Sequence, residues 1–191
     1  IIFGYTILVV LTFMSLILFI NNYRYSIFED NKKITFIFLN MVGMIALTTI
    51  VVNFNIRFLY AVPICILPLI LKTFFDPRLG LFTHVITILN LGFIVPNSFE
   101  FVFLQIMVGI VTILSITQLQ NRANLFITVG RIVLVYLLGY VAFTIIHEGN
   151  ISEIDFMVIG LFLLNGLLTL FAQPLIYLFE RLFKLVSDVS L

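Results

Sequence analysis

Residues 1–20, IIFGYTILVVLTFMSLILFI, contain no charged side chain. A helix needs about 20 mostly apolar residues to cross the hydrocarbon layer of a bilayer, so this run by itself predicts a membrane-spanning helix. The run has neither the basic start nor the small-residue cleavage site of a signal peptide. It also begins without a Met, and we therefore expect the chain to continue a longer protein.

The composition of the whole chain indicates the same class of protein. Apolar residues make up 62% of the 191 residues, charged residues make up 10%, and the mean hydropathy is +1.25. A soluble domain has roughly 45–50% apolar and about 25% charged residues. The apolar runs are too long for the strands of a membrane barrel and do not alternate with polar residues. The sequence therefore predicts an all-α integral membrane protein.

Polar stretches divide the rest of the chain into further apolar runs of membrane-spanning length. We expect a bundle of seven transmembrane helices, joined by loops too short to hold a second folded domain. The expected spans are residues 1–20, 35–54, 58–75, 79–96, 101–119, 125–146 and 156–179. Residues 180–191 are then a cytoplasmic connector to a further domain.

Lys and Arg are distributed unevenly between the two sets of loops. Eight of these residues lie in or beside the loops after the first, third, fifth and seventh spans, whereas the alternate loops hold Arg57 alone. Arg131 lies inside the sixth span and is left out of this comparison. Because cytoplasmic loops retain the positive charge, we expect the N-terminus outside and the C-terminus in the cytoplasm.

Polar side chains recur within the apolar runs at helical spacing. Asn165, Thr169 and Gln173 follow one another at intervals of four in the last span, and Gln105 belongs to a similar stripe in the fifth. Polar groups in hydrocarbon need partners, so we expect these faces to point into the bundle. Arg131 either extends to the interface or pairs with Gln173. The resulting polar network provides either hydrogen bonds between helices or a ligand pocket or conduction path.

Three prolines within the expected spans predict bends in their helices. Pro63 and Pro68 lie in the third span, and Pro174 lies in the last. Each proline removes one backbone hydrogen bond from the helix that contains it. Bent helices also occur in simple bundles, so these prolines predict shape and not function.

The last span is expected to continue as a helix into an amphipathic tail. The predicted helix runs without interruption from Phe156 to about Phe183, and Glu180 is placed to pair with Lys184 one turn later. We expect this tail to couple the bundle to a cytoplasmic domain. The polar residues that would do so are Glu180, Arg181, Lys184 and Asp188.

The sequence contains no recognisable active site. It has no Gly-rich phosphate loop, no cluster with metal-ligand spacing and no nucleophile arranged with a base. We therefore expect no catalytic residue, metal site or cofactor in this segment, and no nucleic-acid partner. No acidic residue lies deep in an expected span, which disfavours an ion-coupled pump.

Three stretches of the chain resemble one family, the bacterial seven-transmembrane HD receptors. VPICILPLILKTFFDPRLGL (62–81) is similar to the third membrane helix of these proteins, with two prolines five apart and then Asp76-Pro77-Arg78. FERLFKLVSDVSL (179–191) resembles the junction between their last helix and the cytoplasmic HD domain. The linker QNRANLF (120–126) also fits. The order and spacing of these stretches, together with the expected topology, strengthen the resemblance.

The resemblance implies a function for the whole protein and a narrower one for this chain. Members of the family carry an extracytoplasmic domain, this bundle, and an HD domain that hydrolyses cyclic-di-AMP at a metal pair. The chain has no His-Asp dipeptide, so no catalytic or metal residue is carried over. What remains is a multi-pass anchor in the bacterial cytoplasmic membrane that transmits a signal between the two domains. Its partners would be the lipid bilayer, those domains and possible further copies of the protein.

Two other classes of function stay open at this point. A small transporter or permease component would use the polar stripes as a substrate path, and the bundle would then bind or move a substrate. A structural membrane scaffold would show neither ligand binding nor coupling to a second domain.

Overall fold

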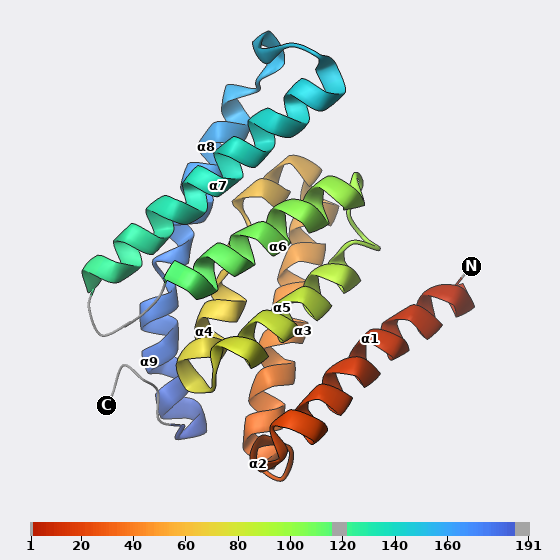
Figure 1. Cartoon of the computed structure of the whole chain (residues 1–191), viewed down its shortest axis with the longest axis vertical. Helices are drawn as coiled ribbons and strands as arrows, with labels where there is room; N and C mark the ends of the chain where they lie inside the picture. The colour runs from red at the N-terminus through yellow and green to blue at the C-terminus, as the bar shows by residue number, and fades with distance from the viewer. Residues whose placement is uncertain (1, 116–121, 186–191) are drawn as a thin grey trace.

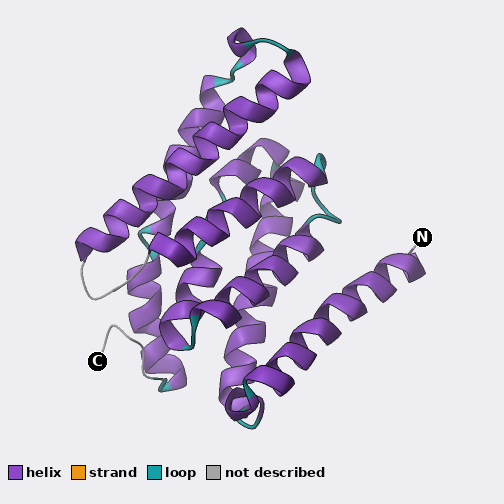
Figure 2. Ribbon diagram, in the orientation of Figure 1, coloured by secondary structure: helices purple, strands orange, loops and turns teal. Residues whose placement is uncertain are grey.

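The computed structural model describes residues 2–115 and 122–185, and every regular element in these ranges is a helix (Figures 1 and 2). Two short elements, η1 and η2, are 3₁₀ helices. In chain order the elements are α1 (Ile2–Tyr23), α2 (Tyr25–Phe28), α3 (Asn31–Phe54), η1 (Ile56–Ala61), α4 (Ile66–Phe74), α5 (Pro77–Leu91), α6 (Ser98–Ser115), α7 (Arg122–Glu148), η2 (Ile151–Glu153), α8 (Phe156–Thr169) and α9 (Ala172–Phe183).

Six helical segments in the described residues are long and apolar enough to cross a membrane. Two of them combine two elements each, η1 with α4 and α8 with α9. The remaining expected span corresponds to α5, which has only 15 residues. The helix of α5 is followed by tight turns up to Val95, whose backbone N–H donates to the Leu91 carbonyl at 3.1 Å.

The two ends of the bundle are named here after the short helices that they carry. The α2 end holds α2, the turn between α4 and α5, and the C-terminal end of α9 (Figure 1). The η2 end, opposite to it, holds η2, η1 and the turn between α5 and α6. The α7–α8 hairpin extends furthest at the η2 end.

The helix α1 lies to one side of the bundle and approaches it through its second half (Figure 1). Its two buried residues are Leu16 and Ile20. The Asn90 amide nitrogen of α5 donates to the Thr12 hydroxyl of α1 at 3.0 Å, which places a polar contact between these two helices. The first half of α1 is consequently the part of the bundle with the least protein around it.

The expected third span is not one regular helix. Its chain breaks at Val62–Cys65, between η1 and α4. Pro63 lies in this break, where it cannot donate a backbone hydrogen bond to a preceding carbonyl. Pro68 does not bend α4 as the sequence suggested, because it is the third residue of that helix. The first four N–H groups of a helix have no partner within it, so proline is tolerated there.

The expected continuous helix from Phe156 to Phe183 is also interrupted. α8 ends at Thr169 and α9 begins at Ala172, so the prediction of an unbroken run was wrong. Pro174 cannot donate to the carbonyl of Leu170, and its ring would collide with that carbonyl in a regular helix. The chain instead makes tight turns there, with the Leu170 N–H donating to the Leu167 carbonyl at 3.1 Å.

Two glycines allow α5 to pack closely against its neighbours. A methyl group on Gly80 would lie 2.9 Å from the Pro68 carbonyl oxygen of α4. A methyl group on Gly109 of α6 would collide with the ring of His84 in α5. The absence of a side chain at these positions therefore fixes how near α4 and α6 come to α5.

Candidate functional site

A buried chain of polar contacts connects α5, α6 and α7. His84 is fully buried in α5, and its Nε2 lies 2.9 Å from the backbone carbonyl oxygen of Gln105 in α6. The Gln105 side chain accepts a hydrogen bond of 2.8 Å from the Tyr136 hydroxyl of α7. Both Gln105 and Tyr136 are buried, so this contact holds α6 and α7 at a fixed register.

Asn165 of α8 supports the break in the third span. Its amide nitrogen donates to the carbonyl oxygens of Tyr60, at 3.1 Å, and of Val62, at 2.8 Å. Tyr60 lies in the last turn of η1 and Val62 directly follows this helix, where the Val62 carbonyl also accepts the Ile64 N–H at 2.9 Å. One buried side chain therefore supplies hydrogen bonds to backbone carbonyls at the break that contains Pro63.

Thr169 continues the polar face of α8 by one turn. Its hydroxyl donates to the Asn165 carbonyl at 2.8 Å and lies 3.3 Å from the Cys65 sulfur. Cys65 is the residue that precedes α4, and it is fully buried. The contact joins α8 to the start of α4 on the far side of the break.

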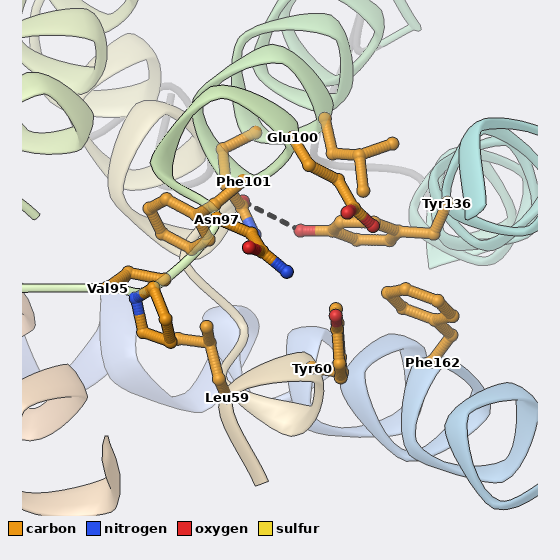
Figure 3. Close-up of a pocket in the computed structure, with 11 residues that line it drawn as sticks. Leu59, Tyr60, Val95, Asn97, Glu100, Phe101, Tyr136 and Phe162 are labelled. Carbon is orange, nitrogen blue, oxygen red and sulfur yellow. Dashed lines mark hydrogen bonds between the residues drawn. The ribbon is translucent and has the colours of Figure 1, made fainter. Parts of the chain in front are cut away.

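A small cavity lies beside the Gln105–Tyr136 contact (Figure 3). Its lining includes residues of η1 and of the α5–α6 turn, which belong to the η2 end. It leaves about 20 Å³ for the centres of water-sized molecules, which is room for roughly one water. Residues from η1, the α5–α6 turn, α6, α7 and α8 line it. They are Leu59, Tyr60, Val95, Pro96, Asn97, Glu100, Phe101, Leu104, Gln105, Tyr136 and Phe162.

Glu100 is the acidic residue of this cavity, and the sequence did not single it out. It lies in the first turn of α6, where the positive end of the helix dipole favours a carboxylate. The residue is only 9% exposed, although the sequence placed it in a loop outside the fifth span. Pro96, Asn97 and Ser98 followed by an acidic residue are typical of the start of a helix. This signal could have placed Glu100 in the first turn of the fifth span.

Two members of the predicted polar network lie apart from these contacts. Arg131 is exposed on α7, and Gln173 is partly exposed near the start of α9. The expected pairing of Arg131 with Gln173 is not formed, and no side-chain hydrogen bond involves either residue within the described ranges. The structure thus brings Gln105, Asn165 and Thr169 into buried contacts and leaves the other two at the surface of the bundle.

The residues expected to couple the bundle to a further domain lie at the end of α9 or beyond it. Arg181 is exposed in the last turn. Lys184 ends the helix in a left-handed conformation, with φ at 52°. Asp188 lies outside the described residues. The helix from which the pairing of Glu180 with Lys184 was predicted thus ends at Phe183, one residue before Lys184.

An aromatic cluster fixes the last turn of α9 to the bundle. Phe36 of α3 is fully buried, and its ring centroid lies 5.3 Å from that of Phe179 and 5.0 Å from that of Phe183. Phe74 of α4 joins the cluster, with its centroid 4.9 Å from that of Phe36. The end of α9 is consequently packed against both α3 and α4.

An ion pair connects two turns at the α2 end. Arg24 Nε lies 2.6 Å from Asp76 Oδ2, and Asp76 also accepts the N–H groups of Arg78 and Leu79 at the start of α5. Partial burial by itself would raise the pKa of Asp76, but the hydrogen bond from Arg24 and those from the two N–H groups outweigh it, so the pKa is lowered. The same contact raises the pKa of Arg24.

The described residues offer no metal-binding group of three or more His, Cys, Asp or Glu side chains. Comparison with protein families shows where the chain belongs. A family model described as a 7TM receptor with intracellular HD hydrolase matches residues 1–187. The chain belongs to this family. Searches of curated proteins and of solved structures gave no significant match. The match covers every described element of this 7TM receptor bundle, from α1 to the end of α9.

Proposed function

We propose that the chain is the membrane anchor and signal-transmitting module of a cyclic-di-AMP phosphodiesterase in the bacterial cytoplasmic membrane. It would link an extracytoplasmic sensor to a cytoplasmic HD hydrolase, whose metal pair lies outside this segment. The family match over residues 1–187 carries this proposal, because it includes α9 and the residues that follow it. The named activity and substrate come from the resemblance of the three stretches quoted above.

The proposed topology has seven crossings, with the N-terminus outside and the C-terminus in the cytoplasm. Its support is the position of the basic residues. Eight of them belong to elements and turns at the α2 end of the bundle, whereas Arg57 begins η1 at the opposite end. The eight are Arg24, Lys32, Lys33, Lys72, Arg78, Arg122, Arg181 and Lys184. By the distribution of positive charge, the α2 end faces the cytoplasm.

The aromatic cluster around Phe36 offers a route for the signal. α9 is the last described helix before the proposed connector, and its Phe179 and Phe183 rings pack on Phe36. Packed side chains transmit a displacement because a dense core has discrete arrangements and little free space. A shift of α3 or α4 would therefore move the end of α9 and whatever follows it.

The test uses the full-length receptor and its hydrolysis of cyclic-di-AMP. Phe183→Ala should loosen the end of α9, so that hydrolysis no longer depends on the state of the extracytoplasmic domain. Leu182→Ala is the matched control, because Leu182 is 65% exposed on the same turn. Regulation that survives Phe183→Ala unchanged would contradict the proposed route, and a full-length protein without this hydrolysis would contradict the proposed activity.

The transporter and scaffold alternatives give different outcomes in the same protein. A transporter would show substrate uptake that persists when the hydrolase is inactivated. A scaffold would show hydrolysis that is equal with and without the bundle substitutions.

A further inference from the structure

The cavity at the η2 end contains a buried carboxylate without a full partner. Figure 3 shows Glu100 among the residues that line the cavity, with its carboxylate directed inward. The His147 imidazole lies beside it, with Nδ1 3.9 Å from Glu100 Oε2, and its side chain is 51% exposed. No hydrogen-bond donor reaches this carboxylate among the described residues. A buried charge is costly unless an opposite charge or several donors compensate it.

The other polar groups of the cavity are acceptors or can act as acceptors. The Asn97 carboxamide and the Tyr60 hydroxyl point toward the same space (Figure 3). Neither side chain forms a hydrogen bond elsewhere in the described part of the chain. Tyr60 and Glu100 line this cavity together. The cavity lining includes no Lys or Arg.

Aromatic rings complete the wall. The ring centroid of Phe162 lies 4.9 Å from that of Tyr136 and 5.3 Å from that of Tyr60. Aromatic faces attract cations through the negative charge of their π-systems. A carboxylate, two neutral oxygens and three rings therefore form a negative surface around a space of about one water molecule.

The size and composition of the cavity select the kind of cation. A space of about 20 Å³ for water-sized centres excludes an organic ammonium group with several carbons. A divalent calcium ion prefers six to eight oxygen ligands, commonly with several carboxylates. Glu100 is the single acid here, which matches a single positive charge.

We propose that this cavity binds one small monovalent cation, sodium, potassium or ammonium, with Glu100 as its counter-ion and the Tyr60 and Asn97 oxygens as ligands. The cation would join η1, α6, α7 and α8, because each of these elements contributes to the lining. The site goes beyond the proposed signalling role, and its test does not use hydrolysis.

The test measures unfolding of the bundle in the full-length receptor, purified in detergent. Cys65 is fully buried and is the one cysteine of this segment, so its reaction with a thiol-reactive fluorophore reports the opening of the bundle. All cysteines outside the segment are replaced. Sodium, potassium or ammonium chloride is titrated while N-methylglucamine chloride keeps the ionic strength constant. We expect at least one of the three cations to raise the unfolding midpoint in a saturable manner.

Three substitutions make the result specific to the cavity. Glu100→Gln should weaken the response at least tenfold, and Glu153→Gln, an exposed acid in η2, should leave it unchanged. Asn97→Gly should weaken the response several-fold without straining the backbone, because Asn97 has a φ of 53°. This variant decides the case if Glu100→Gln does not fold. Equal midpoints in all four salts, or a response that survives both cavity substitutions, would overturn the proposal.

Discussion

Gly109, a single residue of α6, determines how closely α5 and α6 approach each other. Gly109→Ala would place a methyl group against the fully buried His84 ring, so we expect the free energy of unfolding to fall by about 1–3 kcal/mol. Gly130→Ala is the control, since nothing lies within 4 Å of that position. There, alanine should stabilise the helix by about 0.5–1 kcal/mol. Fluorophore labelling of Cys65 during heating measures both effects, and equal shifts in the two variants would contradict the close contact.

Asp76 links stability to pH, because its pKa is lowered in the folded state. Its ion pair with Arg24 stabilises the bundle above the ordinary pKa of an aspartate, 3.8, and this contribution is lost as the pH falls through the lower folded pKa. Asp76→Asn keeps a side chain that can cap α5 but removes the charge. We expect this variant to unfold at a lower temperature than the wild type at neutral pH. The difference should disappear in acid, and a constant difference would refute the role of the charge.

The break between η1 and α4 depends, at the scale of elements, on a side chain from another helix. Asn165→Leu would leave the Tyr60 carbonyl without this donor and the Val62 carbonyl with the Ile64 N–H alone, at a cost of about 1–3 kcal/mol. Thr144→Val is the matched control. Thr144 is also buried, but its hydroxyl donates only to the carbonyl of Tyr140 in its own helix. Thermal unfolding should separate the two variants, and a loss in Thr144→Val as large as in Asn165→Leu would exclude this explanation.

The sequence predicted the existence of these elements better than their continuity. Hydropathy averages over about 20 residues, so it detects the length of an apolar run but not a break of two to four residues within it. Pro63 and Pro174 identified the two spans that break, while Pro68 had no such effect because helix α4 starts just before it. The deciding quantity is the position of a proline relative to the start of its helix. That position depends on tertiary partners such as Asn165.

The sequence predicted which helix face carries the buried polar residues, but it did not predict which residues they contact. Helical spacing placed Asn165 and Thr169 on one face, and both lie buried against the broken third span. Gln173 follows at the same interval, but the turn at Leu170–Phe171 lies between it and that face. Glu100 was missed because a span was drawn from apolar residues alone. An acid can lie inside a span when its helix start and a cavity accommodate it.

The two ends of the whole molecule differ in charge, and this difference predicts how the bundle lies in the membrane. Lys33 lies near the start of α3 at the α2 end, and Asn150 is exposed between α7 and η2 at the η2 end. Because the α2 end carries eight basic residues, it should stay in the cytoplasm. Single cysteines at these two positions, in a Cys65→Ser background of the full-length protein, report the side of each.

An impermeant thiol reagent added to intact cells should label the cysteine at position 150 and not the one at position 33. Lysed cells are the control, because both positions should then react. The two positions are separated by an odd number of crossings only if α5 spans the membrane despite its 15 residues. Labelling of both positions from outside would show that α5 does not cross, and labelling of position 33 alone would reverse the orientation. The experiment therefore tests the seventh crossing and the effect of the basic residues together.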